Sequence, residues 1–209
     1  MINNIYDKNG LVFWEETDIR RRSLIQNEVI NNIKESLSRQ NKAFRFFMTE
    51  APMLTPSNLI DEKYYANEDV FSIDDLTLRP ETTKGSYEFA RYITTHRNEK
   101  LPICVYQSGK SFRREQDQPT KFMRLKEFYQ LEFQVMFSES TLNDYSIKVI
   151  ENLLPLIKLL VGDCRLEDSD RLPSYSIETK DIVRVKNDME LCSISKRTDY
   201  EGAKVLEIA

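Results

Sequence analysis

Two arginines, a glutamate and a phenylalanine have the types and spacing that could hold a nucleoside triphosphate. Arg113 and Glu115 are two residues apart where one predicted strand enters the loop, and Arg124 and Phe128 are four apart where the next strand begins, so each pair is expected to share a face. An arginine can neutralise phosphates, a carboxylate can accept from the adenine amino group, and a phenyl ring can stack on the base. The polar loop 116–123 could close a hairpin that unites them; an exposed hairpin with ordinary ion pairs is the alternative.

The predicted strand 125–137 has two faces of different character. One face holds Tyr129, Leu131, Phe133, Val135 and Phe137, and the other holds Phe128, Gln130, Glu132 and Gln134. The apolar face is expected to pack on a core, whereas the polar face is either solvated or a binding surface. Because lysine and threonine are missing from the polar face, a binding surface is favoured, and Glu132 then joins the hairpin residues.

The elements that must position this hairpin are helices and strands without a regular βαβ alternation. We expect an α+β fold with a mostly antiparallel sheet flanked by helices. Thr17 or Asp18 is the expected cap of the first helix, Thr82 or Thr83 of the second, and Ser140 or Thr141 of the third, which Pro155 should kink or split. Residues 58–76 are expected to be irregular or mixed, and residues 163–175 to form a polar loop. Helices are predicted over about 18–37, 83–93 and 139–161, and strands over 10–16, 44–50, 76–81, 101–113, 125–137, 181–185, 191–195 and 205–208.

Composition excludes several classes of protein. The 209 residues are 40% hydrophobic and 31% charged, which indicates a globular chain with a real core, and the net charge of −4 is unlike that of a basic nucleic-acid-binding domain. The triplet Arg20–Arg22 could still contact RNA, although a solvated helix face is favoured. The chain shows no membrane span or signal peptide, and three scattered cysteines with a single histidine fit a reducing, cytoplasmic setting without a zinc site.

Two segments resemble signature motifs of class II aminoacyl-tRNA synthetases. Phe-Arg-Arg-Glu at 112–115, a loop, and Arg-Leu-Lys-Glu-Phe at 124–128 resemble motif 2. The first helix and the strand that ends in Glu-Ala-Pro at 50–52 resemble motif 1, through which such enzymes dimerise. The resemblance implies one catalytic domain over 1–209, with motif 1 at about 18–54 and motif 2 at about 112–132, and a homodimer formed by the motif 1 helix and strand.

Further strings are similar to the glycyl-tRNA synthetase branch. Leu-Arg-Pro-Glu-Thr-Thr-Lys-Gly at 78–85 is similar to that branch's Leu-Arg-Pro-Glu-Thr-Ala-Gln-Gly, and Gln-Ser-Gly-Lys-Ser-Phe-Arg at 107–113 to its Gln-Ile-Gly-Lys-Ser-Phe-Arg. Ile-Ser-Lys-Arg-Thr-Asp-Tyr at 194–200 is similar to its Ile-Ala-Asn-Arg-Thr-Asp-Tyr. The chain departs from the branch at Lys84, where a glutamine is usual, and at Arg114, where an asparagine is usual.

The resemblance implies that the chain uses ATP and Mg²⁺ to activate glycine and transfers it to tRNA. Arg113 matches the catalytic arginine on the α-phosphate, Glu115 the group that accepts from adenine, and Phe128 the stacking ring. Glu190 matches an acid near Mg²⁺, although a solvated glutamate at a strand end explains it equally well. The implied ATP site is Arg113, Glu115, Arg124, Phe128 and Glu190, with Glu190 also the metal ligand, and the implied amino-acid site is Glu81, Glu132, Glu207 and Arg79.

The resemblance stops before motif 3, which is absent. Glu207 and Ala209 match the first and last residues of the family's Glu-Pro-Ser, and no arginine follows to hold the γ-phosphate. We therefore expect either part of a longer enzyme or a truncated paralogue. Three functions stay open: glycine activation, adenylation of another small amine or amino acid, or a non-catalytic accessory subunit that binds nucleic acid or a partner protein, as the accessory subunit of the mitochondrial DNA polymerase does.

Overall fold

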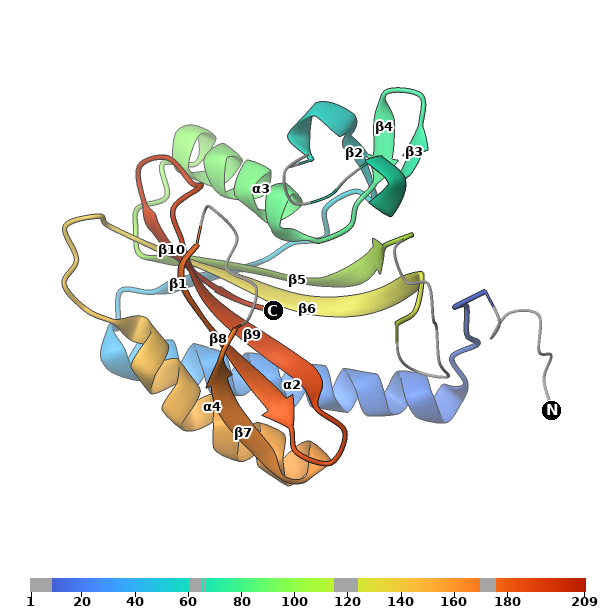
Figure 1. Ribbon diagram of the computed structural model, residues 1–209. Helices are drawn as coiled ribbons and strands as arrows, with labels where there is room; N and C mark the ends of the chain where they lie inside the picture. The colour runs from blue at the N-terminus through green and yellow to red at the C-terminus, as the bar shows by residue number, and fades with distance from the viewer. Residues whose placement is uncertain (1–8, 61–64, 66, 115–123, 170–175) are drawn as a thin grey trace.

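The structure is a computed structural model that describes residues 9–60, 65, 67–114, 124–169 and 176–209 (Figure 1). Two short 3₁₀ helices, Ser57–Leu59 and Asn67–Asp69, lie among the longer elements of this part of the chain. The longer elements are α2 (Glu16–Gln40), β1 (Arg45–Met48), β2 (Leu54–Pro56), β3 (Phe71–Ile73), β4 (Leu76–Leu78), α3 (Thr83–His96), β5 (Ile103–Phe112), β6 (Glu127–Phe137), α4 (Tyr145–Val161), β7 (Cys164–Asp168), β8 (Ser176–Arg184), β9 (Met189–Arg197) and β10 (Lys204–Ile208).

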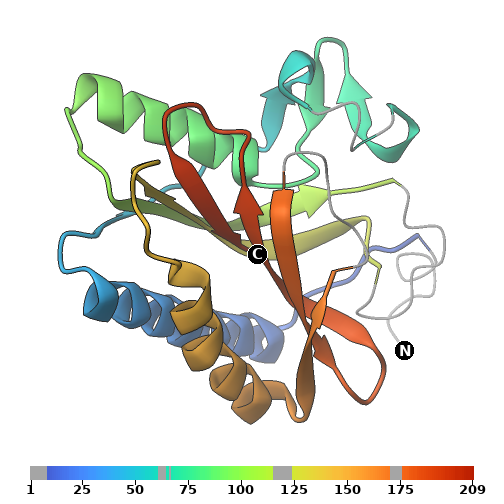
Figure 2. The same ribbon diagram turned by 60° about the vertical axis from the view of Figure 1, so that its left-hand side comes forward.

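A seven-stranded sheet in the order β1-β5-β6-β10-β9-β8-β7 forms the centre of the fold. Helices α2 and α4 cover one face of this sheet and α3 covers the other (Figures 1 and 2). A smaller sheet in the order β2-β4-β3 lies beside α3. The described strand pairs are antiparallel apart from β1 with β5, which confirms the predicted α+β fold with a mostly antiparallel sheet.

The two faces of β6 differ as the sequence predicted. Phe133 and Val135 are buried against α2 and α4, whereas Met136 is buried against α3. Glu132 and Gln134 alternate with the apolar residues and therefore lie on the α3 side, where both are almost fully buried. The pairing of β5 with β6 sets Gln107 opposite Glu132 and so adds a third buried polar residue to this face.

The N-terminal segment differs from its prediction, since residues 10–16 form no strand. The chain instead enters α2 through a capping box in which Glu15 is the cap and Asp18 occupies its third helical position, so neither Thr17 nor Asp18 is the cap itself. Trp14 packs edge-on against Tyr129, and the guanidinium of Arg22 lies 3.6 Å from the centre of the Tyr129 ring. Trp14 therefore anchors the segment before α2 to β6, and the segment does not form a strand.

The region around α4 holds three further corrections. The helix begins after the cap Asp144, whose side chain accepts from the amide of Ser146, and not near Ser140 or Thr141. Of the predicted kink or split at Pro155, the split does not occur, because this proline lies on the exposed face, where water can reach the carbonyl that loses its amide partner. Residues 164–168, predicted as loop, form the edge strand β7, whose exposed charged side chains hid its strand character.

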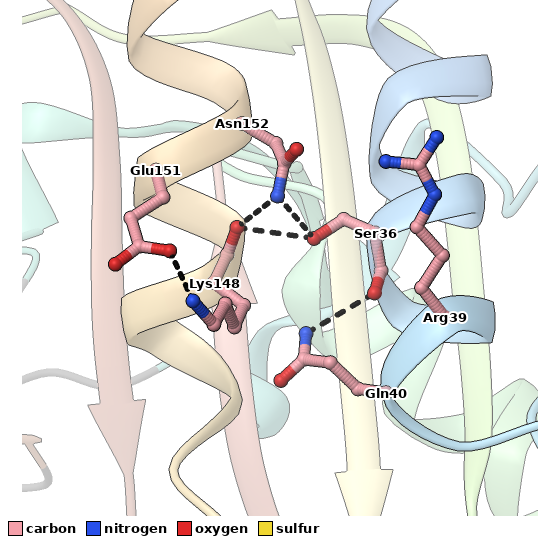
Figure 3. Close-up of a pocket in the computed structure, with 6 residues that line it drawn as sticks. All are labelled: Ser36, Arg39, Gln40, Lys148, Glu151 and Asn152. Carbon is pink, nitrogen blue, oxygen red and sulfur yellow. Dashed lines mark hydrogen bonds and ion pairs between the residues drawn. The ribbon is translucent and has the colours of Figure 1, made fainter.

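A cavity of about 420 Å³ opens between α2 and α4 (Figure 3). Ser36 and Asn152 bridge the two helices there, since the Ser36 hydroxyl donates to the Lys148 carbonyl and the Asn152 amide donates to the Ser36 hydroxyl. The cavity lies on the face of the sheet opposite α3, so it is separate from the buried polar residues of β6. In the described chain, no helix combines the length and the apolar character that crossing a membrane requires.

Candidate functional site

Three glutamates from distant parts of the chain meet on the α3 side of the sheet. Glu132 comes from the middle of β6, Glu207 from the adjacent strand β10, and Glu81 from the loop that leads into α3. The Thr83 hydroxyl lies within hydrogen-bonding distance of Glu132 and Glu207, and the charge of Glu81 acts on Glu132, so we call these three residues the carboxylate cluster. Gln134 donates to Glu207 over 2.7 Å, and its own buried Oε1 has no hydrogen-bond partner among the described residues.

The start of α3 supplies two hydroxyls to the carboxylate cluster. Thr82 Oγ1 lies 2.5 Å from Glu132 Oε2, and Thr83 Oγ1 lies 2.8 Å from Glu207 Oε2 and 3.3 Å from Glu132 Oε2. Thr82 occupies the helix cap position, as predicted, but its hydroxyl makes no capping hydrogen bond because it faces Glu132. The two threonines are therefore residues of the site, a role that sequence reasoning missed by treating them only as caps.

Arg197 is the buried cation nearest to Glu207. Its Nη1 lies 2.8 Å from both Oε atoms of Glu207, while its Nε and Nη2 donate to Asp199 over 3.0 and 2.8 Å. Asp199 also accepts from the Tyr87 hydroxyl and pairs with Lys84. Sequence reasoning did not assign Arg197, although the string Arg-Thr-Asp that contains it was recognised as a family feature.

Burial and mutual repulsion disturb the protonation of these groups. Burial, together with the charges of Glu207 and Glu81, raises the pKa of Glu132 to about 8. Burial also raises the pKa of Glu81, although Arg197 opposes the shift. Burial alone would lower the pKa of Arg197, but Glu207 and Asp199 outweigh it and keep this guanidinium charged.

Arg113, the predicted catalytic arginine, lies beside the carboxylate cluster. Its Nε donates to the Pro80 carbonyl over 3.0 Å, and its guanidinium carbon lies 5.3 Å from the centre of the Phe128 ring. Its Nη2 donates to the Tyr65 hydroxyl over 3.2 Å, and that hydroxyl donates to Glu81 over 3.2 Å. Tyr65 thus connects the arginine to the cluster. It lies in the stretch 58–76, where no motif or periodicity pointed to a site residue.

The structure places only some of the other residues that were predicted to bind ATP. Glu115 lies outside the described residues. Arg124 is exposed and has a left-handed backbone with φ of 55°. Glu190 is exposed at the start of β9, and it flanks the Ser193 hydroxyl at 2.8 Å together with Asp181 at 2.6 Å. Within the described ranges, no group of three or more acidic, histidine or cysteine side chains is arranged to hold a metal ion.

Arg79 was predicted to bind the amino acid, but its hydrogen bonds go to backbone carbonyls. Its Nε donates to the Lys110 carbonyl over 2.9 Å, and its Nη1 donates to the Ala51 carbonyl over 2.6 Å. A Cβ built on Gly109 would lie 2.1 Å from its Nη2, so the close packing depends on glycine. Burial lowers the pKa of Arg79, partly offset by Glu132. The buried guanidinium joins the end of the motif 1 segment to β5.

Residues 65–201 match the family described as the tRNA synthetase class II core domain (G, H, P, S and T). The match covers more than half of the chain, so the chain belongs to the class II aminoacyl-tRNA synthetase core family, as the motif 1 and motif 2 resemblance predicted.

The curated relatives it matches include glycine–tRNA ligases. That of Mycoplasmopsis synoviae is 34% identical over 110 residues, covering 50% of this chain and 24% of the relative. That of Staphylococcus aureus strain JH9 is 31% identical over 144 residues, covering 65% of this chain and 31% of the relative. The chain therefore spans about a quarter to a third of the length of these relatives.

Solved structures support the fold. Prolyl-tRNA synthetase of Giardia lamblia, in complex with prolyl-adenylate, superposes with a TM-score of 0.72 at 12% identity, covering 99% of this chain and 47% of that one. Pyrrolysyl-tRNA synthetase of Desulfitobacterium hafniense superposes with a TM-score of 0.60 at 18% identity, covering 87% and 64%. At these identities the likeness concerns the fold alone.

Proposed function

We propose that this chain binds ATP and glycine on the α3 side of its sheet and joins them into glycyl-adenylate. The observation that carries the proposal is the connection through Tyr65 between Arg113, suited to a phosphate, and Glu81, suited to an ammonium ion. The two ends of an aminoacyl-adenylate need those two kinds of group side by side. The glycine–tRNA ligases among the relatives support glycine as the amino acid.

The reaction asks the protein mainly for positioning and charge neutralisation. A carboxylate oxygen of glycine attacks the α-phosphorus, and the bond from that phosphorus to the leaving pyrophosphate breaks. Arg113 would stabilise the charge that develops on the α-phosphate, and Phe128, against which its guanidinium lies, would stack on adenine. Glu115 and Arg124 remain proposed contacts to adenine and to the outer phosphates.

The carboxylate cluster would hold the glycine ammonium. Glu132 and Glu207 are fixed by the threonines of α3, so their oxygens need little reorganisation when a ligand enters. The unpartnered Oε1 of Gln134 offers a further acceptor. Arg79 would act indirectly, by holding the β5 backbone beside the cluster rather than by touching the amino acid.

Mg²⁺ and tRNA complete the proposal. Glu190 and Asp181 present two neighbouring carboxylates, a donor set that suits Mg²⁺, which commonly takes one or two carboxylates and keeps several waters. A bound Mg²⁺ would neutralise phosphate charge. We further propose that residues 1–209 act as one catalytic domain and that the activated glycine passes to tRNA.

A homodimer is the remaining part of the proposal. Strand β1 is an edge of the large sheet, and Met48 on it is 73% exposed. Met53 and Leu54, which follow in the motif 1 segment, are also exposed. Exposed large apolar side chains on an edge strand such as β1 are typical of a surface that pairs with another chain.

The direct test is glycine-dependent exchange of pyrophosphate into ATP, with calorimetry of ATP, glycine and a non-hydrolysable glycyl-adenylate analogue. Arg113→Ala should lower exchange by about 10²–10³-fold, because it removes a preorganised positive charge. Arg114→Ala is the matched control, since Arg114 is the adjacent exposed arginine, and it should leave exchange nearly unchanged. A folded protein that binds none of the three ligands would refute the proposal.

A further inference from the structure

The single hydrogen of the Thr83 hydroxyl cannot serve both of the carboxylates that lie beside it. Its hydroxyl has one hydrogen but lies within bonding distance of Glu207 at 2.8 Å and Glu132 at 3.3 Å. Glu207 also accepts from Arg197 and Gln134, so it is solvated by the protein as a full carboxylate and takes the shorter bond from Thr83. A lone pair of the Thr83 hydroxyl then faces Glu132, which favours a hydrogen on the Glu132 oxygen.

The balance of charge points the same way. Among the described residues, Glu81 and Glu207 are the carboxylates and Arg79 and Arg113 the cations that interact electrostatically with Glu132, so with Glu132 itself there is one more carboxylate than cations. Because the cluster is buried, a net negative charge is costly there and a single added positive charge would remove it. Beyond this group, Arg197 is shared by Glu207 and Asp199, and Lys84 pairs with Asp199. The phenols of Tyr65 and Tyr87 stand beside them, bonded to Glu81 and Asp199.

We propose that the carboxylate cluster holds one exchangeable proton when its pocket is empty, and that a primary ammonium ion displaces this proton when it binds. The inference rests on the proposed function, because it concerns the same amino-group pocket. The exchange is balanced: a neutral carboxyl and an ammonium ion become a carboxylate–ammonium pair, and the proton leaves to the buffer. The site thereby selects a ligand that brings its own positive charge.

The proton defines a pH range for the exchange. Glu132 is the group that holds the proton, since burial and the charges of Glu207 and Glu81 raise its pKa to about 8. Below that pH, ammonium must displace the proton, so its apparent affinity rises up to about tenfold per pH unit. Above that pH the cluster is already ionised, and the affinity becomes independent of pH until the ligand itself loses its charge.

Two measurements on the full 209-residue chain test the inference. Carbon-13 NMR of the glutamate carboxyls, with Glu132 assigned through Glu132→Gln, should show it titrating near pH 8 in the ligand-free protein. Calorimetry with glycine in phosphate and in Tris at pH about 7 should give heats that differ by the buffers' ionisation enthalpies, with about one proton released per glycine bound. The same pair of buffers at pH about 9 should show almost none.

Two variants test proton release separately from glycine binding. Glu132→Gln resembles the neutral form and should fold, bind glycine more weakly and release no proton. Lys84→Gln keeps all three glutamates but removes a cation that opposes protonation of Glu81, so its proton release should persist to higher pH than in the unaltered chain. Lys84→Gln therefore keeps the test usable even if Glu132→Gln fails to fold.

The outcomes distinguish this inference from the proposed function. Glycine binding with buffer-independent heat at pH about 7, or a Glu132 carboxyl that titrates near its ordinary value of about 4.3, overturns the inference. If glycine does not bind but Glu132 titrates near 8, the proposed function fails, and methylammonium serves as the probe instead. Displacement of the proton by methylammonium then supports the inference, and binding without proton release overturns it.

Discussion

The Nη1 atom of Arg197 lies 2.8 Å from each of the two carboxylate oxygens of Glu207. The two residues are diagonal neighbours on adjacent strands, since Arg197 is opposite Val205 in the pairing of β9 with β10. Both side chains are almost fully enclosed, so the pair fixes the position of the Glu207 carboxylate beside the Thr83 hydroxyl.

Replacing Arg197 by alanine should destabilise the protein strongly. The change leaves Glu207 and Asp199 buried without their main partner, which typically costs about 3–5 kcal/mol. Urea denaturation of the two proteins gives the difference. Arg39→Ala, which breaks an exposed pair with Glu35, is the control and should cost less than about 1 kcal/mol. Similar losses for both variants would contradict the buried-pair interpretation.

Tyr65→Phe tests the connection between the two halves of the site. It removes a hydroxyl that accepts from Arg113 and donates to Glu81 but keeps the ring beside the guanidinium. Hydrogen bonds to charged groups contribute about 1.5–3 kcal/mol, so the apparent affinities for ATP and glycine should fall by about tenfold or more. Calorimetry of each ligand measures this. Unchanged affinities for both, in a folded variant, would show that the hydroxyl has no positioning role.

Gly109→Ala should disturb the packing of Arg79. The new methyl would lie 2.1 Å from Arg79 Nη2, so the guanidinium must leave the carbonyls of Ala51 and Lys110. Overpacking of this kind costs about 1–3 kcal/mol in chemical denaturation. In an Arg79→Met background the same change should cost clearly less, because the clashing group is gone. Equal costs in both backgrounds would mean that the strain has another source.

The stability of the ligand-free protein should fall as the pH rises from about 4.5 to about 8. Burial raises the pKa of Glu132 to about 8 in the folded protein, against about 4.3 in the unfolded chain, so the folded state binds more protons within this range. The slope should be on the order of 1 kcal/mol per pH unit, measured by denaturation at several pH values. Glu132→Gln should flatten the slope, and an equally steep slope in that variant would assign it to other groups.

Met48→Glu tests the proposed dimer. A charge on the exposed edge strand β1 should break an interface that buries Met48, so sedimentation should change from dimer to monomer. Leu159→Glu is the matched control, since Leu159 is 83% exposed on α4, far along the chain from motif 1. An unaltered chain that sediments as a monomer, or two variants that behave alike, would remove the support for a dimer through this edge.

Local pattern was enough to predict much of the scaffold. Alternation along β6 correctly separated Phe133 and Val135, which lie in the core, from Glu132 and Gln134, which lie on the opposite face. Two predictions from the local pattern were wrong, because exposure to solvent or contact with a neighbouring element determined the structure of those segments. The charged edge strand β7 looked like a loop, and the apolar segment before α2 looked like a strand although its Trp14 packs on Tyr129 and Arg22.

The sequence by itself determined the residue types of the motif 2 hairpin, the faces of its strands and the resemblance to a synthetase core. Only the tertiary structure decided which charges meet. Glu132, Glu207 and Arg197 come together because β10 lies between β6 and β9, and Tyr65 reaches Arg113 from a stretch without a local signal. Side-chain alternation is a property of neighbouring residues, whereas strand order depends on contacts between residues far apart in the chain.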